Sequence, residues 1–347
     1  MYHDTEHIRR IRFPFFVNSA EIRNDYMWFI DNINSGLHCY DLKCEIIKAS
    51  YKLPYTQLFG KNVYGSLKIC RDKVILLPNY GKDILLFHMN SRKFRKIDLE
   101  LQVGDGIPLY SNTYLLNNFL YIFILAVAKI VIIDLQKEII EKIIVIPFET
   151  NRKSVVLFSN DCAYVKNCES NIVLKFDLKE QLFEKSEIGM DNGKFQLLEG
   201  NGTDIYLRGD HGKVLKWNLK NFLTIGQFPV ELQYYSVQNN TLIWKSFRKS
   251  KIENNTFDKF YDDGEGIWIL PSFCCELIHI NKKTYKIKKM ILEGEEELTI
   301  RDKITWGKYY ICSDSNRDNL WLYSIKRELF YKINVKELTY EEIELYV

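Results

Sequence analysis

The sequence predicts an all-β fold, a seven-bladed β-propeller built from seven tandem copies of a four-stranded unit. Three observations predict it. Seven short apolar segments end in a polar residue, most of them recur every 41 to 47 residues, and each follows another strand-like segment by about 13 residues. A fixed period in the forties is typical of a propeller or a helical solenoid. The segments are short and rich in β-branched and aromatic residues, which favours strands over helices.

The polar residue that ends each of these segments is called the anchor below. We expect it to accept a hydrogen bond from a backbone N–H two residues later and so to begin a turn. The anchors are Asp41, His88, Asp134, Asp177, Asn218, Asn281 and Ser324. Each anchor segment is interpreted as the third strand of its unit, and the partner segment upstream of it as the second strand. Gly and Asn between the two suit the tight turn of a hairpin.

A first strand before each hairpin and a fourth strand after each anchor complete the units. The fourth strands mix apolar and charged residues, as expected of an outer strand with one solvated face. Four strands repeated seven times give a single propeller domain. Its blades are predicted at 14–53, 60–102, 110–147, 153–190, 194–230, 232–293 and 297–336, followed by a tail at 337–347.

The interval of 63 residues between Asn218 and Asn281 predicts an insertion in the sixth unit, at 245–263. Long loops on a rigid frame are disproportionately functional, which makes this segment a candidate binding region. The alternative is a solvated excursion without a role. The stretch 241–244 before it has the composition of an additional strand, so the register of the sixth blade stays open.

The two ends of the chain lie outside the seven units. The segment 8–14 is basic and the tail 337–347 is acidic, so we expect the two to meet at the seam between the first and last blades. The alternative is that the tail forms a short amphipathic helix that docks a partner.

Two anchor units carry a resemblance to known repeats. They read Tyr40-Asp-Leu-Lys43 followed by Ile46-Ile-Lys48, and Phe176-Asp-Leu-Lys179 followed by Phe183-Glu-Lys185. These units resemble the repeats of YVTN-type, NHL-type and quinoprotein-like propellers over roughly residues 14–336. The Thr-Gly pair that often follows the Asp in those repeats is missing, as are the Trp-Asp dipeptide of WD repeats and the Gly doublet of kelch repeats. The resemblance implies a seven-bladed propeller and assigns no functional residue.

Composition narrows the class of partner. Of the 347 residues, 48 are basic and 45 acidic, and the near balance argues against a nucleic-acid binder. The basic runs 91–96 and 282–289 fall on predicted outer strands, where Lys discourages edge-to-edge pairing. The apolar run 119–133 is shorter than a membrane span and is interpreted as the hairpin of the third blade. We therefore predict no nucleic-acid partner and no membrane association.

The N-terminus lacks the basic and apolar regions of a signal peptide, which predicts a cytoplasmic protein. The eight cysteines form no CxxC pair, so reduced thiols are expected. The abundance of Lys, Ile and Asn is typical of an AT-rich bacterial genome. The six histidines do not cluster and no HExxH spacing occurs, which predicts neither a metal nor a cofactor. His88 is expected to make a turn and not to bind a ligand.

Candidate ligand-binding residues come from the turns between second and third strands and from the loops that enter each blade, because these lie on one face of a propeller. A hydrolase or lyase could draw an acid, a base and a charge clamp from them. The alternative is that they are the polar residues that any turn needs. The candidates are Asp31, Tyr80, Arg152, Arg208, His211, Asp314 and Arg317, with Asp105, Asp210 and Asp318 beside them.

No catalytic motif stands out, so the favoured interpretation is a binding or scaffold propeller that presents its loop-rich face to another protein. The alternative is an enzyme, a hydrolase or lyase, that acts on a carbohydrate or small conjugate at the mouth of the central channel. A third interpretation is a sensor that binds a small molecule or sugar without chemistry. The fold does not decide between them.

Overall fold

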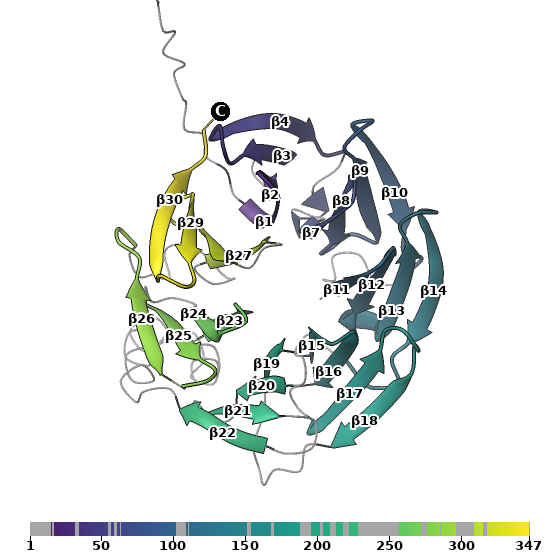
Figure 1. Cartoon of the computed structure of the whole chain (residues 1–347). Helices are drawn as coiled ribbons and strands as arrows, with labels where there is room; N and C mark the ends of the chain where they lie inside the picture. The colour runs from purple at the N-terminus through teal and green to yellow at the C-terminus, as the bar shows by residue number, and fades with distance from the viewer. Residues whose placement is uncertain are drawn as a thin grey trace, which may run out of the picture.

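The computed structural model describes most of the chain. The described residues are 15, 17–31, 35–54, 57–58, 61–62, 64–101, 109, 111–150, 154–167, 170–187, 196–201, 204–208, 213–217, 222–227, 257–271, 276–284, 286–295, 309–314 and 318–346. They fold as antiparallel sheets arranged in a ring, so the predicted all-β propeller with four-stranded blades is confirmed (Figure 1).

The first half of the chain builds three sheets and a ribbon. The first run comprises β1 (Val17–Arg23), β2 (Tyr26–Asp31), β3 (Gly36–Asp41) and β4 (Ile46–Lys52), followed by the ribbon β5 (Gln57–Leu58) and β6 (Lys61–Asn62). The next comprises β7 (Tyr64–Cys70), β8 (Lys73–Pro78), β9 (Asp83–His88) and β10 (Lys93–Asp98). The third comprises β11 (Ser111–Leu116), β12 (Phe119–Ile124), β13 (Lys129–Asp134) and β14 (Ile139–Val145).

The second half repeats the pattern. The fourth run comprises β15 (Ser154–Ser159), β16 (Cys162–Asn167), β17 (Ile172–Asp177) and β18 (Phe183–Glu187), and the fifth β19 (Gln196–Asn201), β20 (Asp204–Arg208), β21 (Lys213–Trp217) and β22 (Phe222–Gln227). The sixth comprises β23 (Phe257–Asp262), β24 (Gly266–Pro271), β25 (Glu276–Asn281) and β26 (Ile287–Ile291). The last comprises β27 (Tyr309–Asp314), β28 (Asn319–Ser324), β29 (Leu329–Asn334) and β30 (Thr339–Glu344).

The number of separate sheets differs from the prediction. Among the described residues the strands form six sheets besides the ribbon, not seven, because one sheet has eight strands in the order β30-β29-β28-β27-β1-β2-β3-β4. Its two halves join where β1 pairs in parallel with β27, through Glu21 with Ser313 and Ile22 with Asp314. The prediction of seven separate blades is therefore corrected to six sheets. A repeat in sequence does not reveal that the first and last units share backbone hydrogen bonds.

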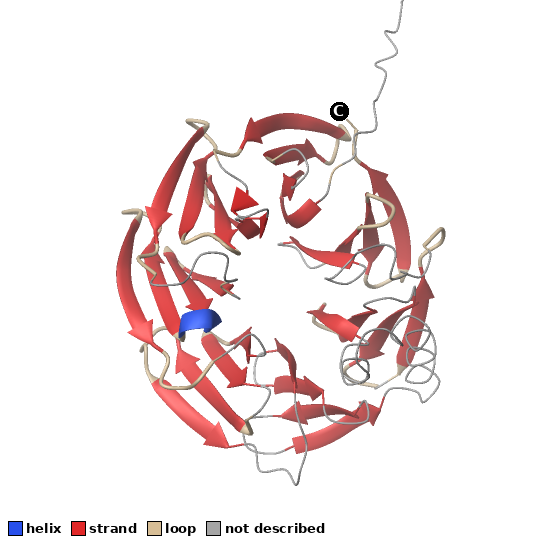
Figure 2. Cartoon of the chain, turned by 180° about the vertical axis from the view of Figure 1, so that it is seen from behind, coloured by secondary structure: helices blue, strands red, loops and turns tan. Residues whose placement is uncertain are grey.

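The core lies between neighbouring sheets. The middle strands are buried on both faces, as β12 and β13 illustrate with five buried residues in succession each. Alternate side chains of β13 contact opposite neighbours: Val131 and Ile133 pack toward β8 and β9, and Ile130 and Ile132 toward β16 and β17. Strands enclosed in this way become continuously apolar. This accounts for the run 119–133, which is a hairpin with one short 3₁₀ turn, η1 (Leu125–Val127), at its tip (Figure 2).

One hydrogen bond recurs around the ring. The residue after an anchor donates its backbone N–H to the carbonyl of a residue 17 positions earlier, in the turn between the first and second strands, over 2.8 to 3.4 Å. The described pairs are Leu42 to Asp25, Met89 to Asp72, Leu135 to Asn118, Leu178 to Asp161, Lys282 to Glu265 and Val335 to Asp318. In these six units the bond ties the two turns at one end of the blade together and defines the repeat.

The recurring bond changes the assignment of strands in the last unit. Its anchor is Asn334 and not Ser324, because Val335 makes the recurring bond and Asn334 Oδ1 accepts from the N–H groups of Lys336 and Glu337 at 3.0 and 3.1 Å. Ser324 ends the second strand of that unit. It was mistaken for the anchor because a similar turn follows it, in which Glu328 N donates to its carbonyl at 2.9 Å.

With Asn334 as the anchor, the C-terminal tail becomes part of the last unit. Residues 339–344 form β30, the outer strand, and not a helix. Leu345 packs in the core shared with β1 and β2, and Ile47 N donates to the Tyr346 carbonyl at 3.1 Å, so the tail lies at the seam. The basic segment 8–14, which was expected to meet it, lies outside the described residues.

Part of the predicted insertion belongs to a blade. Residues 257–262 form β23, the first strand of the sixth unit. The rest of the segment 245–263 up to residue 256, and the additional strand expected at 241–244, lie outside the described residues. The basic runs fall on outer strands in part: 93–96 lie on β10 and 287–289 on β26, and both strands end their sheets, whereas 91–92 and 282–284 lie in turns. No helix among the described residues is long and apolar enough to span a membrane.

Candidate functional site

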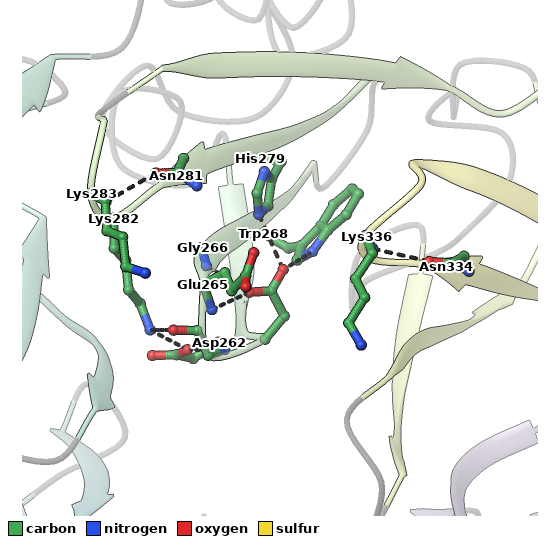
Figure 3. A network of polar contacts seen from close by, with 12 residues as sticks. Asp262, Glu265, Gly266, Trp268, His279, Asn281, Lys282, Lys283, Asn334 and Lys336 are labelled. Carbon is green, nitrogen blue, oxygen red and sulfur yellow. Dashed lines mark hydrogen bonds and ion pairs between the residues drawn. The ribbon is translucent and has the colours of Figure 1, made fainter.

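An acidic turn between β23 and β24 carries a dense polar network (Figure 3). The Asp263 carboxylate accepts from the N–H groups of Glu265 and Gly266 at 2.9 and 2.6 Å, from Trp268 Nε1 at 2.9 Å, and contacts His279 Nε2 at 3.1 Å. Its side chain is 2% exposed. Burial works to raise the pKa of Asp263, but the hydrogen bonds from His279 and Gly266 outweigh it and hold that pKa below the ordinary value.

The neighbouring carboxylate joins the two turns at this end of the blade. Asp262 Oδ1 accepts from Gly264 N at 2.7 Å and forms an ion pair with Lys282 Nζ, which comes from the turn between β25 and β26. Both side chains are less than a tenth exposed. The acidic turn is thus neutralised and bonded internally, and its arrangement suits a structural clamp between turns.

A second buried carboxylate joins two blades. Glu138, in the turn before β14, contacts Lys73 Nζ at 2.7 Å, His88 Nε2 at 3.2 Å and Arg95 at 2.6 Å, all from the preceding sheet. Burial alone would raise the pKa of Glu138, yet the Lys73 hydrogen bond and the nearby positive charges lower it. The His88 carbonyl accepts from Arg92 N at 2.8 Å, so the backbone makes the turn. The His88 imidazole contacts Glu138 instead of making the side-chain bond expected of an anchor.

The inner strands of the first two sheets are joined by side chains and not by a ladder. Ser19 Oγ accepts from Leu67 N and Glu21 Oε1 from Ile69 N, both at 3.1 Å. Burial raises the pKa of Glu21 despite the charge of Lys68, whose Nζ lies 3.8 Å away.

A third histidine lies between a carboxylate and a hydroxyl. His38 Nδ1 is 2.8 Å from Ser50 Oγ, and His38 Nε2 is 3.9 Å from an oxygen of Asp31. Asp31 is fully buried at the end of β2, whereas Ser50 is exposed on β4. Burial lowers the pKa of His38 below its ordinary value, although Asp31 acts in the opposite direction. A neutral imidazole beside a hydroxyl can accept its proton.

Two ends of the ring must be distinguished to place the predicted ligand-binding residues. The hairpin face is the end that carries the turns between the second and third strands, such as β2 to β3 and β8 to β9. Asp31 and Tyr80 lie at this face, Tyr80 half-buried in the turn after β8. Arg208 ends β20 at the same face. Arg152, His211, Arg317, Asp105 and Asp210 lie outside the described residues.

Asp314 lies at the opposite face. It ends β27, which runs parallel to β1, and it pairs with Ile22 beside the turn from β1 to β2. Asp318 directly precedes β28 at that same end. The structure therefore separates Asp314 from Asp31 and Tyr80 by the height of the blade. The prediction placed the strands of the last unit one position too early. Consecutive antiparallel strands run in opposite directions, so this error assigned Asp314 to the wrong face. Asp314 accepts from Trp321 Nε1 at 3.2 Å.

Sequence reasoning missed Ser50, Glu138 and Asp263. Ser50 stands directly opposite His38 in the ladder between β3 and β4, so aligning the two strands would have paired them. Asp263 begins the run Asp-Gly-Glu-Gly, which was interpreted as a plain turn. Glu138 meets its partners across two blades and leaves no local signal. Within the described part of the chain, no group of three or more His, Cys, Asp or Glu residues could hold a metal ion.

Comparison with known proteins identifies the fold and no family. No family model and no curated protein matches the sequence. Among solved structures, a streptogramin B lyase aligns with a TM-score of 0.60 at 11% identity, over 91% of this chain and 93% of the other. AztD from Citrobacter koseri gives 0.52 at 12% identity, over 96% and 87%. Hsv2 from Kluyveromyces lactis gives 0.50 at 9% identity, over 94% and 96%. At such identities the likeness shows the propeller fold alone.

Proposed function

We propose that this propeller is a binding protein that holds an extended segment of another protein against its outer strand β14. The observation that carries the proposal is the apolar character of that edge. Ile139 is 45% exposed, Ile143 36% and Val145 66%. Leu182 on the next blade is 67% exposed, and the bond from Lys142 Nζ to Gln181 Oε1 at 2.6 Å links its turn to β14. Grouped exposed apolar side chains mark protein contacts more often than scattered ones.

Among the described residues, β14 carries three of the exposed large apolar side chains, whereas the outer strands β4 and β26 carry one each, Ile46 at 39% and Ile291 at 64%. The exposed residues of β10 are Lys93, Arg95, Lys96 and Asp98, and charges of this kind discourage strand addition. β14 ends its sheet and pairs with β13 alone, so its outer backbone groups face away from the blade. A β-bulge at Glu141 interrupts the strand, and the ladder is regular from Lys142 to Val145. An extended peptide would add there as a further strand.

The loop-rich hairpin face stays the proposed second contact region. Arg152, His211 and most of the insertion before residue 257 belong to that prediction. Because residues 257–262 are β23, a test of the insertion must remove residues 246–255 and leave the strand intact.

The test is a capture experiment from native lysate at moderate salt, read by mass spectrometry with quantified stoichiometry. It compares the wild type, Ile143→Lys/Val145→Glu, the 246–255 deletion, and Lys288→Glu/Lys289→Glu on β26 as a matched outer-strand control. A stoichiometric protein lost only in the β14 variant supports strand addition, and its extended segment as a synthetic peptide should then bind. Loss only in the deletion moves the site to the loop face. A partner retained by every variant contradicts both sites.

A self-association check accompanies the capture. Light scattering from the wild type over a range of concentrations should show a monomer that stays unchanged in Ile143→Lys/Val145→Glu. A dimer abolished by that substitution would mean that the β14 edge binds a second copy of this chain and no separate partner.

The alternative function is an enzyme, a hydrolase or lyase, acting on a carbohydrate or small conjugate at the channel mouth. Glu21, a carboxyl on an inner strand with a raised pKa, is the described group that favours it. Addition of carbohydrate libraries with detection of released reducing ends would test it, with Glu21→Gln as the variant expected to abolish any turnover.

We also infer that the eight-stranded sheet works as two blades, so that the ring has seven. Its halves β1–β4 and β27–β30 are each antiparallel runs whose neighbouring strands share four to six residue pairs, whereas β1 and β27 share two. A crystal structure in which the eight strands form one continuous, evenly twisted sheet would contradict this inference.

A further inference from the structure

Three polar side chains form a row from the core to the surface on the first sheet. The ladders place Phe29 opposite His38, and His38 opposite Ser50, on β2, β3 and β4 respectively. Asp31, two residues after Phe29, lies on the same side of β2 because alternate residues of a strand share a face. The row begins at a fully buried carboxylate and ends at a hydroxyl on an exposed residue.

The distances indicate which nitrogen of His38 donates and which accepts a proton. His38 Nδ1 lies 2.8 Å from Ser50 Oγ, within the range for a hydroxyl and its base. His38 Nε2 is buried, makes no hydrogen bond, and lies 3.9 Å from the Asp31 carboxylate. The stable tautomer therefore carries its proton on Nε2, toward the negative charge, and leaves the Nδ1 lone pair to accept the Ser50 hydroxyl proton.

The imidazole is held in place on every side. It stacks on Phe29 with ring centroids 5.1 Å apart, and the edge of Phe15 contacts it at 5.0 Å. A Cβ on Gly36 would lie 2.4 Å from His38 Nε2, so the glycine makes room for the ring. An imidazole fixed in this way presents Nδ1 to Ser50 without reorganisation, which is the condition for an effective general base.

We propose that Ser50 is a nucleophile with His38 as its general base and Asp31 as the positioning residue of that base, and that the site takes an acyl group from a carboxylic ester. This activity is independent of the proposed protein binding at β14. The arrangement follows the logic of a nucleophile, a base and an orienting carboxylate, which recurs on unrelated folds.

The reaction balances with the ester and water alone. Ser50 Oγ attacks the carbonyl carbon while its proton passes to His38 Nδ1. The ester C–O bond breaks, the leaving alkoxide takes that proton from His38, and the acyl group remains on Ser50. Water then attacks the acyl-serine with His38 accepting its proton, and the carboxylic acid leaves as the proton returns to Ser50. Asp31 stabilises the imidazolium in both halves.

Lys52 places a positive charge on the same side of β4 as Ser50. It follows Ser50 by two residues on β4, stands opposite Gly36 in the ladder, and is exposed. An ammonium on this side of the strand attracts an anionic acyl donor and the developing oxyanion. The preferred substrate class is therefore an ester whose acyl part carries a negative charge.

The test uses the full chain and a fluorophosphonate probe, which transfers its phosphonyl group to an activated serine as fluoride leaves. Peptide mass spectrometry should place the label on Ser50. Ser50→Ala should lose the label, whereas Ser91→Ala, which removes an exposed hydroxyl from the β9–β10 turn, should retain it. His38→Gln should slow labelling about 100-fold, the low end of a general base's contribution. Absence of label on Ser50, or an unchanged rate in His38→Gln, overturns the proposal.

Further readouts separate chemistry from folding. With p-nitrophenyl acetate, Asp31→Asn should lower kcat without changing KM in protein whose melting is unaltered, and Lys52→Gln should slow anionic esters more than neutral ones. If a buried variant does not fold, Ser50→Cys replaces it. Its thiol should react with iodoacetamide faster than the exposed Cys44 in the same chain. A rate equal to that of Cys44 shows that His38 does not activate position 50 and contradicts the proposal.

Discussion

At the scale of single residues, three histidines on third strands each lie beside a buried carboxylate. His38, His88 and His279 each lie within 4 Å of a buried carboxylate, at 3.9, 3.2 and 3.1 Å. A carboxylate inside a sheet is stable when donors pair with it. His279 Nε2 contacts the Asp263 carboxylate, which also accepts from the Trp268 indole. The His279 ring occupies the space that a Cβ on residue 266 would need, and glycine leaves this space free.

The contact at Gly266 predicts a measurable coupling. A Cβ added there would lie 2.0 Å from His279 Nε2, so Gly266→Ala should displace the imidazole from Asp263 and lower the free energy of unfolding by about 1–3 kcal/mol. Urea unfolding of the single and double variants measures it. In a His279→Ala background the same substitution should cost much less, because the clash is gone. Equal costs in both backgrounds would show that His279 is not the neighbour that matters.

Two carboxyl groups predict an acid-sensitive component of stability. The pKa values of Asp263 and Glu138 are lowered on folding from ordinary values of 3.8 and 4.5. Their contribution is therefore present above those values and is lost as the pH falls through the lower values of the folded state. Thermal melts at pH 7 and pH 3 should show a smaller drop in Tm for Asp263→Asn and Glu138→Gln than for the wild type. If the drop in Tm in both variants is as large as in the wild type, the acid sensitivity comes from other groups.

At the scale of elements, six of the described units are closed at one end by a bond between two turns. The backbone form of this bond recurs with a separation of 17 residues. An ion pair between the same two turns accompanies it in four units. The pairs differ in burial. Lys282 and Asp262 are 8% and 6% exposed, whereas Lys336 and Asp318 are 70% and 64% exposed. Solvent screens the exposed pair and leaves the buried one strong.

The difference in burial predicts that replacing Lys282 by alanine destabilises the protein more than replacing Lys336. Lys282→Ala leaves the Asp262 carboxylate buried without its cation, and should lower the free energy of unfolding by about 3 kcal/mol or more. Lys336→Ala serves as its control and should change stability by less than about 0.5 kcal/mol. Chemical denaturation at pH 7 compares them. Similar losses in the two variants would mean that the Lys282 pair is solvated in solution.

At the scale of the whole molecule, the ring closes without exchange of strands. The first unit is built from the N-terminal part of the chain and the last from the C-terminal part. The seam consists of the short parallel pair of β1 with β27, the bond from Tyr40 Oη to the Glu344 carbonyl at 3.2 Å, the bond between Tyr323 Oη and the Phe15 carbonyl, and a shared apolar cluster. Residues after β29 are therefore part of the closure.

Removal of the tail predicts a loss of cooperativity. A chain that ends at Leu338 lacks β30, the Leu345 side chain and the Tyr346 carbonyl that accepts from Ile47, and it exposes the outer edge of β29. It should melt at a lower temperature and over a broader range than the full chain, as followed by circular dichroism. Deletion of Val347 alone serves as the control. An unchanged melting curve would show that the ring closes without its last strand.

The sequence by itself determined the repeat, the strand order within most units, and the apolar middle hairpins. These features depend on local propensity and on the period of the repeat. The expected turns are confirmed at four anchors, where each Oδ1 accepts from two backbone N–H groups: Asp41, Asp134, Asp177 and Asn281. Tertiary structure decided the rest. Ser324 and Asn334 begin similar turns, and the bond from Val335 N to the Asp318 carbonyl reveals which is the anchor. Likewise, Glu138 meets Lys73, and His38 meets Ser50, through contacts between strands, because side chains distant in sequence become neighbours only when the register and the ring are set.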